Sequence, residues 1–330
     1  MEHVKFGITD YRVSRLGLGC MSMSGVYGKQ DDRECIATIQ RALDRGINIL
    51  DTSHSYGEGH NQELIGKAIK GRRDKVVIHS KTGSPKGKTA DGINRGGGGR
   101  DYLRQVCEES LRRLGTDRLD VLCMSRVDRR VPIEESVAAM AEMVKEGKTR
   151  YIALSEASPE TIRRAWTVHP IASLQIEYSL FSRDPEPFGN IKAVRERGMG
   201  FMAYSPLGRG ILSGQFHSVD DIPAGDRRRE HPRYSGDNMK KNVALVRQLE
   251  EIAAEKGASL PCLALAWLLH QGQDIIPIPS SKTRAHLEDN LKALDLVLDA
   301  DDLARIDRIC PYGAAAGTRY PEKDMSRLNV

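Results

Sequence analysis

Residues 47–81 read INILDTSHSYGEGHNQELIGKAIKGRRDKVVIHSK. Two short apolar runs, 47–50 and 76–80, flank a stretch at 61–70 that has a helical pattern. Runs that are apolar nearly throughout are typical of parallel strands that are buried on both faces. This segment therefore predicts a strand, a helix and a second strand parallel to the first.

The same alternation extends along the whole chain. Further strand-like runs lie at 15–20, 119–124, 151–155, 173–178, 200–205 and 274–279. Helical patterns separate them, at 31–42, 100–114, 133–146, 158–168, 187–197, 238–256 and 260–270. Eight strand-like runs that alternate strictly with helices predict a (β/α)8 TIM barrel, formed as a single domain over residues 1–330.

A doubly wound open sheet is the structural alternative. Such a sheet normally carries the glycine fingerprint G-x-G-x-x-G after its first strand, and GLGCMSMSG (17–25) lacks it.

A second glycine-rich stretch, KGKTADGINRGGGG (86–99), follows the third strand and could hold a phosphate at a helix start. Because it lacks the lysine–serine ending of a P-loop, a mobile surface loop is the favoured interpretation.

Composition limits the class of protein and its partners. The formal net charge is +5 in 330 residues, and we interpret the basic run at 227–229 as a solvated loop, so we expect no nucleic-acid partner. No window approaches the ~18 consecutive apolar residues of a membrane helix, and the N-terminus does not resemble a secretory signal. We therefore expect a cytoplasmic protein without a membrane partner. The cysteines form no C-x-x-C pair or metal-ligand spacing, which favours a reducing compartment and no metal site.

Polar side chains end several of the predicted strands. Asp51 ends the second strand and Tyr56 lies in the following loop, Lys81 ends the third strand, and Ser125 ends the fourth, just before Arg126. In (β/α)8 barrels, catalytic groups lie where the strands end and the following loops begin. We therefore expect these side chains to meet at one rim of the barrel.

An aspartate, a tyrosine and a lysine at one rim can form a tunable proton donor. A tyrosine hydroxyl has a pKa near ~10, and a neighbouring ammonium favours the phenolate and lowers that pKa. A carboxylate beside the lysine holds the ammonium in place. Tyr56 would donate the proton, Lys81 would tune the pKa of Tyr56, and Asp51 would orient Lys81. Taken singly, Asp51 could also be a cap, Tyr56 a half-buried loop aromatic and Lys81 a solvated strand end.

With these motifs in order, the sequence resembles the aldo-keto reductases over nearly its whole length. The matching segments include NILDTSHSYGEGHNQELIGKAI (48–69), VVIHSKTG (76–83), GTDRLDVLCMSRVDRRVPIEES (115–136) and IPIPSSKTRAHLEDN (276–290). Residues 154–184 resemble the branch that includes perakine reductase and related bacterial reductases. The resemblance implies NADPH-dependent interconversion of a carbonyl substrate and an alcohol, with Asp51, Tyr56 and Lys81 as three members of the family's catalytic tetrad.

The resemblance also implies a cofactor site. Tyr204 would stack on the nicotinamide, Gln175 would bind its carboxamide with Ser155 beside it, and Ser281, Lys282 and Arg284 would hold the 2′-phosphate of NADPH. Hydroxyl, ammonium and guanidinium groups suit a phosphate dianion. The other expected cofactor-binding residues are Gly19, Met21 and Asp51, the loop of Ser205, Pro206, Leu207, Gly208, Arg209 and Gly210 along the pyrophosphate, and Asp289 and Asn290 near the adenine.

Ser125 departs from the family pattern, because it stands where the tetrad histidine is expected. A serine can donate one hydrogen bond but carries no charge and is shorter. Three interpretations remain open. The protein could be a working reductase with altered substrate or pH preference. It could be a slow or inactive NADPH-binding regulatory protein, like the potassium-channel β subunits that also lack the histidine. Finally, His54 or another group could replace the imidazole, although alternation directs His54 away from the site and His79 into the barrel core.

The sequence leaves the substrate and the oligomeric state open. Tyr312 and Tyr320 in the C-terminal tail are possible pocket walls, and we favour their interpretation as surface aromatics.

Overall fold

The computed structural model describes residues 1–83 and 97–330. Within these residues, eight strands form one sheet in which every neighbouring pair is parallel. They follow one another across the sheet in chain order: β3 (Leu18–Gly19), β4 (Ile49–Ser53), β5 (Val77–Lys81), β6 (Leu119–Met124), β7 (Thr149–Ser155), β8 (Ser173–Glu177), β9 (Gly200–Tyr204) and β10 (Ile275–Pro277). All eight predicted strands are therefore confirmed.

The first and last strands of the sheet meet and close it. The N–H of Gly17 donates to the carbonyl of Pro277 at 2.9 Å, and the N–H of Gly19 donates to Pro279 at 3.1 Å. A side chain at Gly19 would place its Cβ 2.6 Å from the carbonyl oxygen of Ile278, so the closure requires glycine at this position. The predicted (β/α)8 barrel is confirmed.

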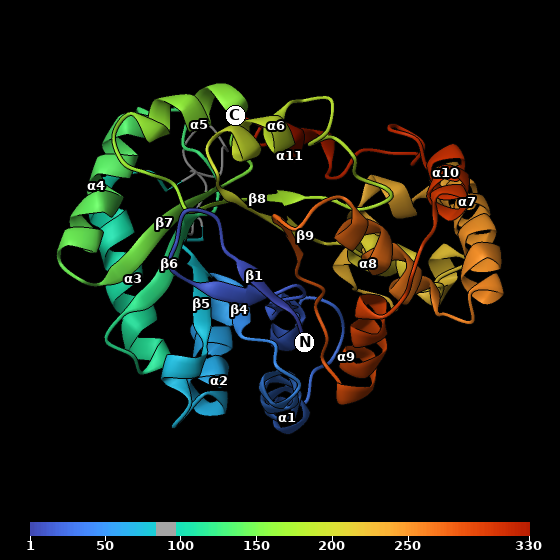
Figure 1. The fold of residues 1–330 in the computed structure, drawn as a ribbon, viewed down its shortest axis with the longest axis horizontal. Helices are drawn as coiled ribbons and strands as arrows, with labels where there is room; N and C mark the ends of the chain where they lie inside the picture. The colour runs from blue at the N-terminus through green and yellow to red at the C-terminus, as the bar shows by residue number, and fades with distance from the viewer. Residues whose placement is uncertain (84–96) are drawn as a thin grey trace.

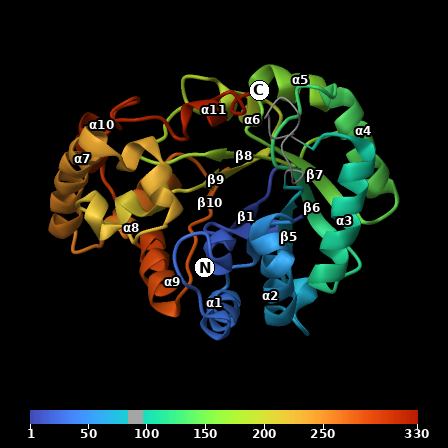
Figure 2. The same cartoon turned by 180° about the vertical axis from the view of Figure 1, so that it is seen from behind.

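The helices surround the strands, as both views of the ribbon show (Figures 1 and 2). They are α1 (Asp32–Asp44), α2 (His60–Ala68), α3 (Arg100–Leu114), α4 (Ile133–Lys145), α5 (Pro159–Trp166), α6 (Asn190–Glu196), α7 (Gly236–Glu255) and α8 (Leu260–His270). Each matches a predicted helix. The start predicted at 187 was wrong, because Gly189 precedes α6 in the left-handed region, at φ 79°.

A short hairpin that the sequence did not predict closes the N-terminal end of the barrel. Strands β1 (His3–Lys5) and β2 (Arg12–Ser14) pair antiparallel. The N–H of Ser14 donates to the side-chain oxygen of Asn48, directly before β4, at 2.8 Å. Apolar side chains of the hairpin pack with those inside the barrel: Val4, Phe6 and Val13 with Ile49, Val77, Val121, Met202 and Ile276. This plug leaves the C-terminal rim as the open end.

Three more helices follow the last strand: α9 (Arg284–Leu291), α10 (Ala300–Ile309) and α11 (Glu322–Met325). The C-terminus then returns to the barrel beside α5 and α6 (Figure 1). The N–H of Ser158 donates to the carbonyl of Val330 at 2.9 Å, and Asn190 donates to the side chain of Asn329 at 3.1 Å. The tail thus crosses the C-terminal rim.

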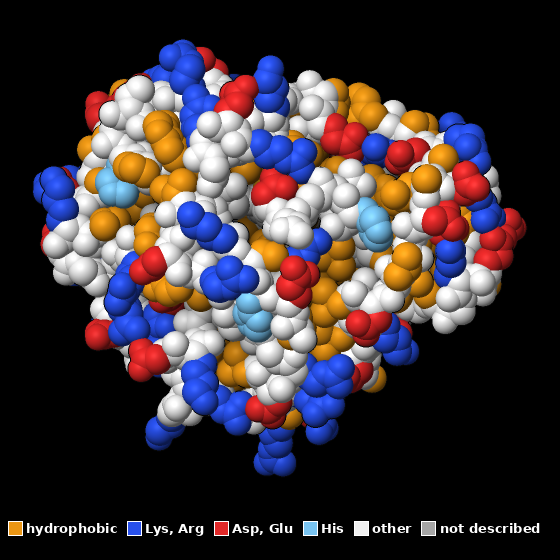
Figure 3. Space-filling view, viewed as in Figure 1, with side chains coloured by type: hydrophobic (Ala, Val, Ile, Leu, Met, Phe, Trp, Pro, Cys, Tyr) orange, Lys and Arg blue, Asp and Glu red, His pale blue; other side chains and the backbone are white. Residues whose placement is uncertain are grey.

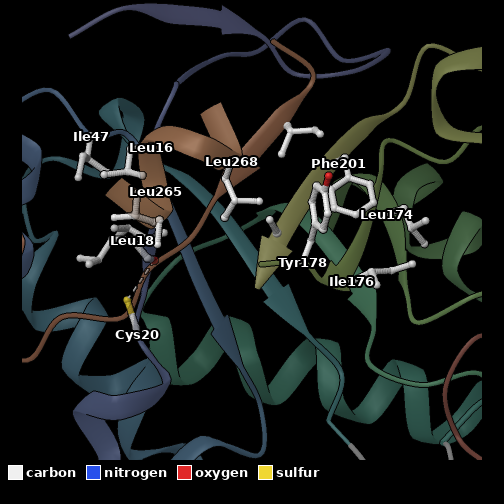
Figure 4. Close-up of a cluster of buried hydrophobic side chains, with 14 of the residues drawn as sticks. Leu16, Leu18, Cys20, Ile47, Leu174, Ile176, Tyr178, Phe201, Leu265 and Leu268 are labelled. Carbon is white, nitrogen blue, oxygen red and sulfur yellow. Dashed lines mark hydrogen bonds between the residues drawn. The ribbon is translucent and has the colours of Figure 1, made fainter. Parts of the chain in front are cut away.

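The larger hydrophobic core lies between the strands and the helices. Figure 4 shows part of it, with Leu265 and Leu268 of α8 near Leu16 and Leu18. The ring of Tyr178 contacts Trp267 and Phe201 edge-on, with centroids 5.5 and 5.8 Å apart. Burial of such large side chains at each strand–helix contact fixes the barrel that carries the rim.

The surface carries both signs of charge, and basic and acidic side chains are interspersed over the face in Figure 3. Within 1–83 and 97–330, no single helix is long and apolar enough to cross a membrane; only α7 and α8 meet that test together, bent by 87°. The same residues contain no group of three or more His, Cys, Asp or Glu placed to hold a metal ion. Most of the glycine-rich stretch at 86–99 lies outside the described residues.

Candidate active site

Asp51 and Lys81 form a buried ion pair at the C-terminal rim. They come from the neighbouring strands β4 and β5. The Lys81 Nζ lies 2.6 and 2.5 Å from the two carboxylate oxygens of Asp51. Burial alone would raise the pKa of Asp51, but the charge of Lys81 and the contact with His79 hold it below its usual range. Burial opposes the charge on Lys81, and Asp51 holds the Lys81 pKa above its usual range. Both groups are therefore charged at neutral pH.

Tyr56 begins a short 3-10 turn (Tyr56–Gly59) that follows β4. The Lys81 Nζ lies 5.0 Å from the centre of the Tyr56 ring. Burial raises the pKa of Tyr56 to about 12, while the charge of Lys81 and a hydrogen bond with it act in the lowering direction. The structure therefore brings the three predicted side chains together. The phenol is protonated at neutral pH, as a proton donor must be.

Two further side chains hold the Asp51 carboxylate from the barrel interior. Gln175 of β8 donates to Asp51 Oδ1 at 2.7 Å, and the Nδ1 atom of His79 lies 3.2 Å from the same oxygen. Burial lowers the pKa of His79, which favours its neutral form. His79 is thus a core histidine, as its spacing from Lys81 predicted. His54 instead lies 2.6 Å from Glu109 on α3, outside the rim, so it does not replace an imidazole there.

Ser125 lies at the end of β6 with its hydroxyl already accepting one hydrogen bond. The N–H of Gly83 donates to Ser125 Oγ at 2.8 Å. Because a hydroxyl has one proton and two acceptor lone pairs, this contact leaves the Ser125 proton free to be donated. Ser125 and Tyr56 line the same cavity of about 630 Å³. A carbonyl oxygen in that cavity could accept from Ser125.

The tail crosses this cavity and builds part of its wall. Arg319 forms a buried ion pair with Glu156 at 3.0 Å, and the hydroxyl of Tyr320 lies 3.2 Å from that of Tyr204. The guanidinium of Arg209 lies 4.5 Å from the Tyr320 ring centre. Burial alone would raise the pKa of Tyr320, but Arg209 and Arg126 bring it below its usual value. The interpretation of Tyr320 as a surface aromatic was wrong, whereas Tyr312 is exposed as expected.

A groove of about 450 Å³ adjoins this cavity and shares Tyr56 and Tyr204 with it. Most of the expected cofactor-binding residues line the groove: Gly19, Met21, Asp51, Tyr204, Ser205, Pro206, Leu207, Arg209, Gly210, Lys282, Asp289 and Asn290. Gln175 lines the larger cavity instead. The groove therefore leads from the rim along the loop after β9 to α9.

Four of the expected cofactor-binding residues line neither the groove nor the larger cavity. Ser155 is buried near Arg126, and the carbonyl of the buried Gly208 accepts from the hydroxyl of Tyr234. Ser281 is buried and accepts from the Asn290 amide at 3.0 Å, which positions a residue that does line the groove. Arg284 is exposed and pairs with Glu34 on α1 at 2.8 Å.

The end of the groove near α9 carries Lys282 and Arg228, and Arg228 is also paired with Asp226 at 2.7 Å. Lys282 donates to the carbonyls of Tyr27 and Lys29 at 2.6 and 2.9 Å. Burial and the nearby charge of Arg228 both lower the pKa of Lys282, so a bound anion would stabilise its ammonium. Arg228 lies over the rings of Phe216 and Tyr27, at 4.6 and 5.1 Å from their centres. The interpretation of 227–229 as a purely solvated loop is wrong for Arg228, because Arg228 lines the groove.

The sequence pattern of the Aldo/keto reductase family matches residues 15–310. The chain belongs to the aldo/keto reductase family. It is 40% identical over 323 residues to a protein of Glycine max named probable aldo-keto reductase 1, covering 97% of this chain and 92% of that protein. It is 39% identical over 320 residues to the aldo-keto reductase yakc [NADP(+)] of Schizosaccharomyces pombe, covering 96% and 94%.

Solved structures of the family have the same fold. The glycerol dehydrogenase of Gluconobacter oxydans superposes with a TM-score of 0.81 at 27% identity, over 93% of this chain and 94% of that one. An aldo/keto reductase of Klebsiella pneumoniae, in complex with NADP and acetate, superposes with a TM-score of 0.73 at 28% identity, over 97% and 98%. The resemblance seen in the sequence is therefore confirmed at the level of family; the branch stays a prediction.

Several residues of this aldo/keto reductase site carried no role in the sequence interpretation. Arg126 was visible as the residue after a strand end, which is a signal that could have marked it. Tyr27 and Phe216 lie in irregular segments without periodicity, and no local signal distinguishes them. Glu177, two residues after Gln175 on β8, pairs with Arg209 at 2.8 Å and fixes the loop along the groove.

Proposed function

We propose that this protein catalyses NADPH-dependent reduction of an aldehyde or ketone to an alcohol, or the reverse oxidation. The observation that carries the proposal is the buried contact of Lys81 with Asp51 at 2.5 Å, with the Tyr56 ring 5.0 Å away. Bound NADPH supplies a hydride to the carbonyl carbon. The chain's own residues must then hold the carbonyl oxygen and protonate it.

Tyr56 donates its proton to the carbonyl oxygen as the oxygen becomes negative. The Lys81 ammonium stabilises the resulting phenolate, because an adjacent positive charge favours the charged form of the phenol. Asp51 keeps Lys81 in place through two short contacts, and Gln175 and His79 fix Asp51 in turn. Ser125 supplies a second hydrogen bond to the oxygen, in the place that the resemblance assigns to histidine.

The groove supports NADPH as the cofactor. A dinucleotide with a 2′-phosphate needs an extended groove with cations at the adenosine end, and Lys282 and Arg228 lie at the end near α9. Asn290 lies near Lys282 in the groove wall, where an adenine would be bound. Tyr204 lines the rim end of the groove and would stack on the nicotinamide. Arg284 would have to leave Glu34 to join the phosphate.

Ser125 also supports a second candidate function. Loss of an oxyanion donor costs roughly 100- to 1,000-fold in rate, and a serine is a weaker donor than an imidazolium. A protein that binds NADPH tightly but turns over slowly could act as a regulatory or scaffold subunit. The intact Tyr56, Lys81 and Asp51 contacts favour catalysis over this alternative.

One experiment separates the two functions. NADPH binding is followed by the fluorescence of the dinucleotide, and turnover by loss of its absorbance with aldehydes, ketones and sugars. Consumption of NADPH with at least one carbonyl compound supports the reductase. Tight binding with no consumption across the panel would contradict it and support the scaffold.

A further inference from the structure

The larger cavity carries an excess of positive charge on its walls. Such a cavity, enclosed by protein of low dielectric constant, concentrates its field and attracts ligands of the opposite charge. Among the lining residues that the structure describes, the acidic ones are Glu230 and Asp324, and the cationic ones are Lys81, Arg126, Arg209, Arg227, Lys323 and Arg327.

Several of these cations have a carboxylate partner within the protein. Lys81 contacts Asp51 at 2.5 Å, and Arg209 contacts Glu177 at 2.8 Å. Arg327 lies 3.8 Å from Asp324. Their charges are therefore offset at short range, and they do not by themselves define a site for an anion.

Arg126 differs from them in the chemistry of its partners. Its Nη1 donates to the Ser125 carbonyl at 2.6 Å and lies 3.4 Å from Ser155 Oγ. Its Nη2 lies 3.3 and 3.5 Å from the hydroxyls of Tyr320 and Tyr204. All four acceptors are neutral, and no carboxylate of the described residues forms an ion pair with Arg126. These contacts fix the guanidinium, and the one carboxylate that acts on its charge from beyond contact distance, Glu156, is itself paired with Arg319 at 3.0 Å.

The position of Arg126 relates it to the reacting group. It directly follows Ser125 at the end of β6, and both line the cavity into which Tyr56 and Lys81 project. An arginine held in this way can bind a carboxylate or phosphate through its planar donors. A substrate that reaches from Tyr56 toward β7 would therefore place its far group near Arg126.

We propose that Arg126 makes this protein selective for carbonyl substrates that carry a carboxylate or phosphate group. Arg126 binds the anionic group while the carbonyl oxygen faces Tyr56 and Ser125. This inference rests on the proposed reductase function and adds the substrate class to it. The reaction is unchanged: the carbonyl carbon gains the hydride of NADPH, the oxygen gains the Tyr56 proton, and solvent returns a proton to Tyr56.

The test compares three aldehydes that share one reacting group. Two are anionic, 4-carboxybenzaldehyde and 4-formylphenyl phosphate, and the third is the neutral methyl 4-formylbenzoate. We expect kcat/KM to be at least about tenfold higher for one of the anionic aldehydes at low salt, with the lower KM, as one charged hydrogen bond can provide. The preference decreases as salt screens the charges. Equal values for all three, or a preference for the ester, would overturn the proposal. The two anionic arms distinguish carboxylate from phosphate.

Variants assign the preference to Arg126. In Arg126→Gln, we expect the ratio of kcat/KM between the anionic and neutral aldehydes to fall by about 10- to 100-fold, chiefly through KM. Arg126→Lys, which keeps the charge, retains part of the ratio. The control Lys192→Gln changes an exposed lysine on α6 and leaves the ratio unchanged. A ratio that survives in Arg126→Gln would overturn the assignment. If Arg126→Gln does not fold, two other measurements test the assignment: the kcat/KM ratio in Arg126→Lys, and the salt dependence of that ratio in the wild-type protein.

A binding measurement keeps this inference separate from the proposed function. If no aldehyde consumes NADPH, the reductase proposal fails, and titration calorimetry of benzoate and methyl benzoate with the NADPH complex tests Arg126 alone. Benzoate binding that is lost in Arg126→Gln supports the anion site. Equal binding of both compounds, or binding of neither, overturns it.

Discussion

The Lys81 ammonium and the Asp51 carboxylate form a two-pronged ion pair, with nitrogen–oxygen distances of 2.6 and 2.5 Å, and both groups are almost fully buried. A buried pair of this kind contributes little net stability relative to an apolar pair. Its effect is local, because it keeps one positive charge beside the Tyr56 ring. Removal of either partner leaves the other buried and uncompensated.

Lys81→Met is expected to abolish turnover and to destabilise the fold by about 3–5 kcal/mol at pH 8, where Asp51 remains charged without its partner. The loss should be smaller at pH 5. With Lys81 present, the lowered pKa of Asp51 contributes stability above the unfolded-state pKa of about 3.9, and this is lost as pH falls through the folded-state pKa. Without Lys81, burial raises the pKa of Asp51. Asp51 then takes up a proton as pH falls, so no unpaired charge stays buried.

Urea unfolding at both pH values checks this, with Lys192→Met as the exposed control. If Lys81→Met lowers the free energy of unfolding by the same amount at pH 5 and pH 8, Asp51 is not the group left unpaired.

Ser125→His is expected to raise turnover on simple aldehydes, because an imidazole donates a hydrogen bond and can carry charge during proton transfer. Ser125→Ala is expected to lower kcat by roughly 10- to 100-fold, since it removes the remaining donor. Steady-state rates with one aldehyde measure both. If the rate of Ser125→His is equal to or lower than the rate of the wild-type protein, the cavity is adapted to serine and its contact with Gly83.

Lys282→Met is expected to raise the Kd for NADPH by about 10- to 100-fold, because a charged contact with the phosphate is lost. The Kd for NADH, which lacks this phosphate, should stay nearly unchanged. Arg284→Met tests the residue that the resemblance places at the same phosphate. Dinucleotide fluorescence measures both constants. An equal loss for NADH and NADPH would place Lys282 away from the 2′-phosphate. A smaller effect for Arg284→Met than for Lys282→Met is expected, because Arg284 is held by Glu34.

Arg319→Met is expected to destabilise the protein by about 3–5 kcal/mol, because it leaves the buried Glu156 without its partner. It should also free the tail that carries Tyr320, so trypsin should cut within 321–330 faster than in the unchanged protein. Adding Glu156→Gln should recover part of the stability, since no charge is then left unpaired. Arg163→Met, at an exposed pair with Glu160, is the control and should leave unfolding unchanged. A stable, protease-resistant Arg319→Met would show that the tail is held by other contacts.

The barrel could be predicted from the sequence because each central strand is buried on both faces and therefore appears as an apolar run. The same periodicity placed Asp51 and Lys81 at one rim, and it directed His79 inward and His54 outward. The short β1–β2 hairpin has too few residues to show a period. The contacts of Tyr320 with Tyr204 and of Arg319 with Glu156 join segments more than 100 positions apart. Such contacts depend on how the finished barrel presents its rim, so no local pattern contains them.

The role of Tyr56 is tested most directly by Tyr56→Phe, measured for NADPH binding by fluorescence and for aldehyde reduction by absorbance, beside the exposed control Tyr312→Phe. The phenyl ring keeps the wall of the groove but has no proton to give. We predict that Tyr56→Phe binds NADPH with a Kd within about threefold of the unchanged protein, since no charged contact is lost, and reduces no carbonyl compound. Carbonyl reduction by Tyr56→Phe at the unchanged rate would contradict the assignment of Tyr56 as the proton donor.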